Sequence, residues 1–208
     1  MMVKYLKDPA AIYAQSFATV RAEAVLDRFP ADVSEVVVRL IHACGIPAIA
    51  EDIAYTDDAV SAGRDALKSG APIFVDANMV AAGIIRRHLS DNEIICTLDD
   101  DGVADNAKRD QTTRSAAAVE RWGPRLGGAV VAIGNAPTAL FRLLELIEGG
   151  APKPAVVLGF PVGFVGAAES KDALAANAQG IEFITLKGRV GGSAIASAAV
   201  NALAGGLE

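Results

Sequence analysis

The sequence predicts an α/β fold in which helices wind on both faces of a mainly parallel, five-stranded sheet. Short runs rich in Val and Ile recur as continuous apolar segments rather than alternating ones, which is typical of parallel strands buried on both faces. Helical stretches separate these runs, and such alternation favours a doubly wound sheet with right-handed crossovers. The chain has 208 residues, 52% hydrophobic and 21% charged. We therefore expect a single domain over residues 1–208.

The predicted elements follow one another along the chain. Strands are expected at 71–76, 93–98, 128–134, 154–160 and 181–186. Helices are expected at 58–70, 78–89, 113–123, 137–150, 170–180 and 191–206. Two further helices, at about 9–29 and 32–44, form an N-terminal helical extension that packs on the sheet or on a neighbouring chain. Ligands of such folds bind beyond the carboxyl ends of the strands.

Composition and charge exclude several classes of protein. The net charge is −6, so no basic stripe is available to replace phosphate counterions, and a nucleic-acid partner is disfavoured. Cys44 and Cys96 have no CxxC spacing, which speaks against a disulfide scaffold or a zinc site and indicates a reducing cytoplasm. The N-terminus has no signal-peptide core, and no uninterrupted apolar run reaches about 18 residues, so no membrane span is expected.

The glycine-rich loops match no nucleotide-binding motif. GFPVGFVGAAESK (159–171), which contains Gly163, lacks GxGxxG, and KGRVGGS (187–193) lacks GxxxxGK[ST]. The first loop either brings backbone close to a flat ligand or forms a tight turn. The second either holds an anion at a helix N-terminus or uses Ser193 as an ordinary cap. LDDDG (98–102) is interpreted as a solvated turn rather than a magnesium site.

His42 is the candidate catalytic residue. Apolar residues recur with helical spacing from Val33 to Cys44, Gly45 ends the helix, and His42 lies roughly opposite the apolar stripe. It is either a solvated surface residue or a group that faces a cleft or a partner chain. The negative end of the helix dipole favours a protonated imidazole, so a pKa near or above neutrality, suited to a general acid, is expected. His88 lies between basic residues and is interpreted as a surface residue.

The segment VRLIHACG (38–45) resembles the precorrin-8X methylmutase family, enzymes of the corrin ring pathway to cobalamin. Segments at 11–24, 70–84, 113–122, 132–147, 151–174 and 188–203 are similar to the same family in the same order. The likeness therefore covers nearly the whole chain.

The resemblance implies a flavodoxin-like fold and a homo-oligomer, above all a dimer, with sites near the subunit contacts. It implies an intramolecular methyl transfer, from carbon 11 to carbon 12 of precorrin-8X, that gives hydrogenobyrinic acid without a cofactor or a metal. His42 maps onto the family's catalytic histidine and would act as a general acid toward the ring C nitrogen. Protonation would make the conjugated system electron-poor and ease a 1,5-sigmatropic methyl shift.

The substrate implied by the resemblance is a flat ring rimmed with carboxylates. Arg21, Arg114 and Lys171 would pair with those carboxylates. Ser16 would offer a hydroxyl and Gly163 would let backbone approach the ring. The other expected substrate contacts, from loops after strands, are Asp76, Asn78, Asn135 and Thr138. Ile85 is also expected in the substrate site, as a departure: the family pattern often carries Thr near this position.

Three alternatives stay open. In the first, the chain is the cobalt-precorrin-8 methylmutase of the anaerobic pathway, although overall likeness favours the metal-free substrate. Or it is mainly a corrin-binding carrier that holds the product and hands it to the next pathway enzyme. If the resemblance is set aside, a flavodoxin-type module for acyl or phosphorylated ligands also suits the pattern.

Overall fold

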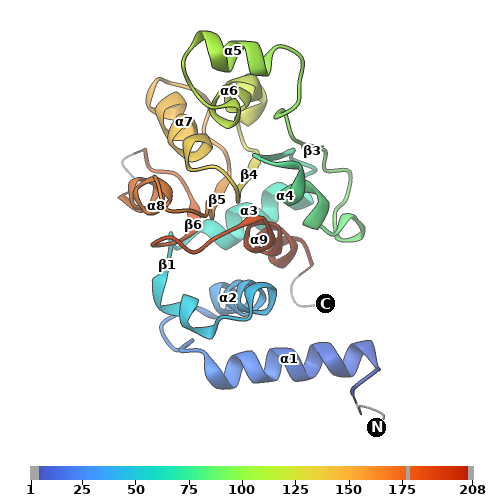
Figure 1. Ribbon diagram of the computed structural model, residues 1–208. Coiled ribbons are helices and arrows are strands. Elements are labelled where there is room, and N and C mark those ends of the chain that lie inside the picture. Colours follow the sequence, from blue (N-terminus) through green and yellow to red (C-terminus); the bar gives the residue numbers. More distant parts are fainter. Residues whose placement is uncertain (1–4, 177–178, 206–208) are drawn as a thin grey trace.

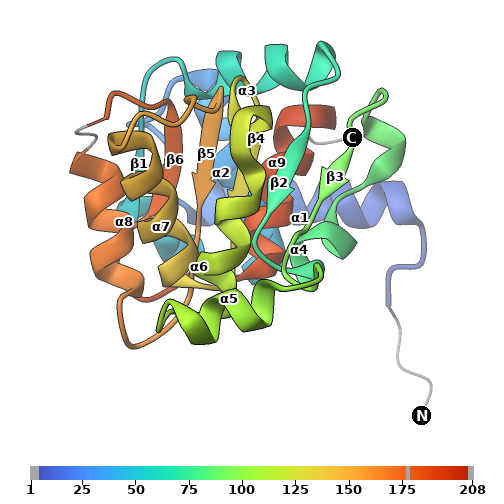
Figure 2. The ribbon, with the colours of Figure 1, turned by 90° about the horizontal axis from the view of Figure 1, so that it is seen from above.

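The computed structural model describes residues 5–176 and 179–205, and a six-stranded sheet runs through the middle of this part of the chain. The strand order is β1-β6-β5-β4-β2-β3. The parallel strands are β2 (Ile73–Val75), β3 (Ile94–Ile95), β4 (Val130–Ile133), β5 (Val156–Gly159) and β6 (Phe183–Leu186), and β1 (Ile53–Tyr55) runs antiparallel to β6. Figures 1 and 2 show this sheet from two directions.

The five predicted strands are confirmed, each within its expected range, but the predicted strand number is wrong because β1 adds an edge strand. β1 was not predicted because it has only three residues, two of them partly exposed. The five parallel strands, taken alone, follow the order 2-1-3-4-5, which is one of the two common doubly wound arrangements. The winding direction therefore reverses between β2 and β4, where ligands of such sheets usually bind.

Helices cover both faces of the sheet. On one side lie α5 (Val103–Arg109), α6 (Arg114–Val119), α7 (Pro137–Glu148) and α8 (Ala167–Ala176). On the other lie α3 (Ala59–Lys68), α4 (Asn78–Gly83) and α9 (Ser193–Gly205). Beyond α9 comes α2 (Ala31–Cys44), and α1 (Pro9–Glu23) forms the outermost layer (Figure 1). The two N-terminal helices thus extend one side of the sandwich by two layers.

Helix α9 lies very close to the sheet and to its neighbours because its side chains are small. Its sequence, SAIASAAVNALAG, is mostly Ala and Ser, and the residues from Ile195 to Leu203 are all buried. A Cβ atom added at Gly134, just after β4, would lie 2.7 Å from Ala196 Cβ and 2.8 Å from Ser193 Cα. The N-terminus of α9 therefore sits against backbone that only glycine can provide.

The N-terminal extension is confirmed as two helices, the first of which is shorter than predicted. α1 begins after Asp8, whose carboxylate accepts the Ala11 N–H at 2.9 Å. It ends at Glu23 rather than near residue 29. α2 ends as predicted, since Gly45 takes φ +71° and donates its N–H to Ile41 O at 2.7 Å.

Two predicted helices are interrupted. The helix expected at 78–89 stops at Gly83 and resumes only as a 3-10 turn, Arg86–His88. The helix expected at 113–123 passes after Val119 into a 3-10 segment, Glu120–Leu126. α5 was not predicted. The helices expected at 170–180 and 191–206 reach residues 177–178 and 206, which lie outside the described residues. No helix in the described part of the chain is long and apolar enough to cross a membrane.

Candidate active site

A surface cleft with a volume of about 460 Å³ opens between α1, α2, α4 and α9. This volume lies in the usual range of small-molecule sites. Its lining residues are Tyr13, Arg39, His42, Ala43, Met79, Gly83, Ile85, Ser193, Ala194, Ser197, Ala198 and Asn201. They come from sequence regions far apart, so the cleft exists only when α2 packs on α9 and α1 packs on α2.

His42 is held in this cleft by contacts from α1. Its ring is exposed, and its Nδ1 lies 2.8 Å from the hydroxyl of Ser16. The rings of Tyr13 and Phe17 flank the imidazole, with centroid distances of 5.5 and 5.1 Å. Because Ser16 occupies Nδ1, Nε2 is the ring nitrogen left to meet a ligand. This position agrees with the prediction that His42 lies outside the core of its own chain, and of the alternatives left open it favours a cleft over open solvent.

The predicted electrostatics of His42 are wrong for the free protein. Partial burial lowers the pKa of His42 below its usual 6.5, and the positive charge of Arg39 lowers it further. The helix dipole alone favours the imidazolium, but burial and the neighbouring guanidinium oppose it. In the absence of a ligand, the neutral imidazole is therefore favoured at neutral pH.

Arg39 and Tyr13 are cleft residues that the sequence analysis missed. Arg39 is 7% exposed and lines the cleft, and burial lowers the pKa of its guanidinium. α1 packs on α2, and Val38, the residue before Arg39, is fully buried. The i, i+3 spacing of Arg39 and His42 was the available signal, since such residues are neighbours on a helix.

Asn201 fixes the wall of the cleft opposite α1. Its side chain, 6% exposed, accepts the Ile85 N–H at 2.8 Å and donates to Gly83 O at 2.9 Å. These two bonds account for the end of α4 at Gly83, because they satisfy the backbone groups that the interrupted helix leaves unpaired. Ile85, an expected substrate contact, lines the cleft as a result.

A polar cluster lies next to the cleft, at the carboxyl edge of the sheet. Asn78 Nδ2 and Arg114 both donate to the carboxylate of Asp99, at 2.8 Å each. The Thr113 and Thr138 hydroxyls are 2.7 Å apart. The structure thus brings Asn78 and Arg114 together on Asp99. Thr138 lies close by, since it bonds Thr113, the residue before Arg114. We call Asn78, Asp99 and Arg114 the edge cluster.

Asp76 and Asn135 meet where the winding of the sheet reverses, but Asp76 takes a structural role. Its carboxylate is 3% exposed and accepts the N–H groups of Gly134, Asn135 and Ala136 at 2.9, 2.9 and 2.7 Å. Burial raises the pKa of this carboxyl, and the three N–H bonds oppose the rise. The carboxylate of Asp76 therefore fixes the turn before α7, and Asp76 is not among the residues that line the cleft.

Lys171 is also withdrawn from any surface ligand. Its side chain is fully buried and its Nζ donates to Val190 O at 2.6 Å. Burial lowers the pKa of this amine to about 8. The expectation that Lys171 pairs with a substrate carboxylate is corrected accordingly, because its ammonium group fixes the loop before α9.

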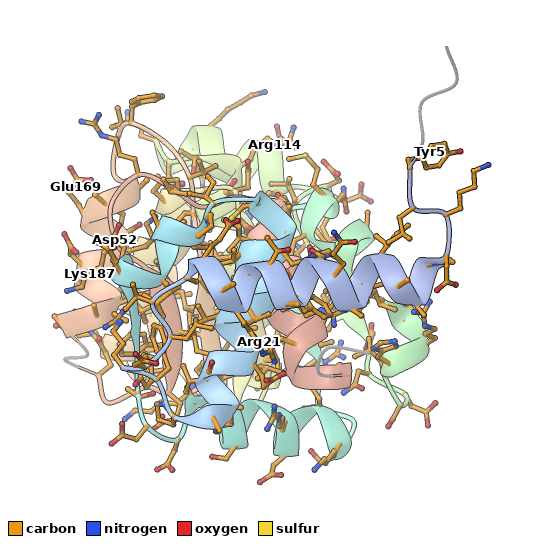
Figure 3. The ribbon with its side chains drawn as sticks, turned by 90° about the horizontal axis from the view of Figure 1, so that it is seen from below. Tyr5, Arg21, Asp52, Arg114, Glu169 and Lys187 are labelled. Atoms are coloured by element: carbon orange, nitrogen blue, oxygen red, sulfur yellow. The ribbon has the colours of Figure 1, made fainter. Side chains whose placement is uncertain are left out.

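Arg21 and Gly163 lie away from the cleft lining. Arg21 pairs with Glu35 across α1 and α2. Arg114 begins α6, which lies across the sheet from α1, and Figure 3 shows the two arginines well apart. Gly163 takes φ +146° and lines a separate apolar hollow with Phe164 and Val190. The sequence grouped these residues in one substrate site, but the described structure separates them.

The chain is similar over nearly its whole length to proteins of one family. The family model described as precorrin-8X methylmutase matches residues 11–205. The chain belongs to the precorrin-8X methylmutase family. The precorrin-8X methylmutase of Pseudomonas aeruginosa is 55% identical over 204 residues, 98% of each chain. The cobalt-precorrin-8 methylmutase of Priestia megaterium is 37% identical, covering 94% of this chain and 87% of that protein.

A solved structure of the precorrin-8X methylmutase from Thermus thermophilus superposes with a TM-score of 0.83 at 38% identity, covering 93% of this chain and 95% of that one. As a precorrin-8X methylmutase family member, the chain is an isomerase of cobalamin biosynthesis that shifts a methyl group. The resemblance found in the sequence is therefore confirmed at the level of family, fold and reaction type.

Proposed function

We propose that this chain converts metal-free precorrin-8X into hydrogenobyrinic acid by moving the methyl group from carbon 11 to carbon 12. The observation that supports this proposal most directly is the exposed imidazole of His42, oriented by Ser16 inside a cleft. A general acid needs a fixed direction and access to the substrate, and His42 has both.

In this proposal Nε2 of protonated His42 donates a proton to the ring C nitrogen. The electron-poor ring then allows the methyl group to migrate with its bonding pair. Because the reaction is an isomerisation, the proton taken up by the ring is balanced by one released as the product forms. Ser16 keeps the imidazole oriented throughout, since its hydroxyl bonds the nitrogen that does not face the substrate.

In this proposal, substrate binding raises the protonated fraction of His42. Arg39 disfavours the imidazolium in the free protein. A substrate carboxylate that pairs with this guanidinium offsets its charge and raises the pKa of His42. The edge cluster binds a second carboxylate through Arg114 and Asn78, so the ring is held at two separated points. Ile85 contributes an apolar wall to the ring.

The metal-free substrate is supported by the degree of likeness. Identity is 55% to the precorrin-8X methylmutase of Pseudomonas aeruginosa and 37% to the cobalt-precorrin-8 methylmutase of Priestia megaterium. Among residues 5–176 and 179–205, no group of three or more His, Cys, Asp or Glu side chains is placed to hold a metal ion. That finding concerns metal ions bound by protein side chains. It does not bear on cobalt carried by the substrate, so the metal-free substrate is proposed on sequence identity alone.

We further propose that the protein acts in the cytoplasm as a homodimer and passes its product to the next enzyme of the pathway. The two thiols, Cys44 and Cys96, are free, which supports a reducing compartment. Tyr13 on α1 is 50% exposed and Met79 on α4 is 63% exposed, and both line the cleft. Apolar groups at the rim of an open cleft support the proposal that a second copy of the chain binds beside it. The open cleft also supports transfer of the product to another protein.

The decisive experiment follows the absorption spectrum of metal-free precorrin-8X mixed with the purified protein. We expect the product chromophore to appear with wild type, and His42→Ala to abolish this change while still binding hydrogenobyrinic acid. His88→Gln is the matched control, because it changes the other histidine, which lies outside the cleft lining, and should retain turnover. Turnover by His42→Ala would refute the acid mechanism, and wild type that binds pigment without converting it would favour the carrier or the cobalt substrate.

A further inference from the structure

We propose that Asp99 is a built-in competitor that occupies the substrate-carboxylate site formed by Arg114 and Asn78 until the substrate displaces it. The inference rests on the proposed function, because it concerns how that substrate is recognised. It assigns a role in specificity to a carboxylate that the sequence analysis attributed to a solvated turn.

The two donors grip Asp99 as they would grip a bound carboxylate. Arg114 donates to Oδ1 and Asn78 Nδ2 donates to Oδ2, each at 2.8 Å, so both oxygens are engaged. The donors come from α4 and α6, which lie on opposite sides of the sheet. A charge-assisted pair of this kind is a common way of recognising a carboxylate. The site is thus complete before any ligand arrives.

The framework of the protein holds Asp99 in place. The preceding Thr97 is buried, and its hydroxyl donates to Ala118 O at 2.7 Å and accepts the Trp122 Nε1–H at 3.1 Å. The Asp100 N–H closes the turn onto Thr97 O at 3.2 Å. The backbone around Asp99 is therefore anchored in the core, and its carboxylate is presented from a fixed point.

The ion pair is also easy to exchange and close to the cleft. The side chains of Arg114 and Asp99 are 54% and 62% exposed, and ion pairs this exposed contribute little to stability. Asn78 is followed directly by Met79, which lines the cleft, and consecutive Cα atoms are about 3.8 Å apart. A carboxylate carried by a ring in the cleft can displace Asp99, whereas a neutral amide at the same position competes poorly with it. Asp99 therefore selects for the free acid.

The test compares Asp99→Asn with Asp101→Asn, which removes the same charge from the same exposed turn but not from the edge cluster. For Asp99→Asn we expect KM for precorrin-8X to fall by up to about fivefold with kcat unchanged, the size expected for loss of one exposed competing pair. The Kd for hydrogenobyrinic acid, measured by absorption titration, should fall in parallel. Asp101→Asn should leave both constants close to wild type.

The effect must depend on Arg114. In an Arg114→Gln background we expect weaker binding overall and no further change in KM when Asp99→Asn is added. Equal constants for wild type and Asp99→Asn, an increase in KM, or an equal fall with Asp101→Asn would each overturn the competitor role. A wild-type protein that does not convert precorrin-8X would instead overturn the proposed function, so the two failures are distinguishable.

Discussion

His42 lies between two opposing influences, the end of its helix and the guanidinium of Arg39. The C-terminal end of α2 stabilises an imidazolium, while partial burial and Arg39 favour the neutral ring. In the empty cleft only a small fraction of His42 is therefore protonated at neutral pH, and an anion that offsets the charge of Arg39 raises this fraction.

This balance predicts a pH profile. For the free enzyme, kcat/KM should fall as pH rises through a pKa below 6.5, because the protonated imidazole is the active form and its pKa is lowered. The fall in kcat should occur at higher pH, because kcat reports the complex, in which a substrate carboxylate offsets Arg39. Stopped-flow absorption from pH 5 to about 9 measures both. A single, shared midpoint above 6.5 would contradict the role given to Arg39.

Single residues were predictable where periodicity alone decided their position. The exposure of His42 followed from helical spacing within 14 residues of α2. The Ser16 contact did not, since it joins residues 26 positions apart on two helices. Lys171 was assigned to the substrate as a cation for its carboxylates, and Asp76 because it follows a strand in a loop where ligands of such folds bind. Their burial depends on backbone N–H and C=O groups that only the folded chain supplies.

At the scale of elements, α9 determines the shape of the site. Its first turn supplies Ser193 and Ala194 to the cleft, and its later residues position the end of α4 through Asn201. Gly134 lets this helix approach β4 closely. A small shift of α9 would therefore move the part of the cleft lining that α9 supplies and the end of α4 together.

Gly134→Ala tests this dependence. We expect a loss of about 1–3 kcal/mol in the free energy of unfolding, the usual cost of overpacking, together with weaker product binding. Gly149→Ala is the matched control, because a Cβ there would meet its nearest atoms at 3.4 and 3.5 Å, an ordinary contact. Urea denaturation and absorption titration measure the two effects. Full stability and affinity in Gly134→Ala would show that the close approach is not required.

Elements were predictable when their hydrophobic pattern was long enough. The five parallel strands and α2 carry continuous or periodic apolar runs, and they formed where expected. β1 has three residues and gains its pairing only from β6. The end of α4 is imposed by Asn201, more than a hundred positions away in the sequence, so local propensity pointed to a continuous helix.

At the scale of the whole molecule, α1 is an outer layer with little cover. It buries only Val20, whereas Ile12 and Tyr13 are 43% and 50% exposed. Exposed apolar groups gathered on one helix commonly mark a contact with another protein. A second copy of the chain placed there would lie beside the cleft, which suits the proposed dimer.

Sedimentation equilibrium should accordingly give a mass of twice 21.4 kDa for the wild type. We expect Ile12→Lys to shift the protein toward monomer and to reduce turnover, because a charge at the contact would have to be desolvated. Val162→Lys serves as the control, since Val162 is 45% exposed but lies in the separate apolar hollow near Gly163. A wild-type monomer, or dissociation by Val162→Lys alone, would contradict a dimer through α1.

The packing of α2 on α9 also has a consequence for the order in which the chain is made. About 150 residues separate the end of α2 from the start of α9. At synthesis rates of about 5–20 residues per second, the apolar stripe of α2 leaves the ribosome roughly 7–30 seconds before its cover exists. During this interval α2 lacks its packing partner α9. The newborn chain thus exposes this apolar stripe early, and the cleft that α9 helps to form is among the last features to appear.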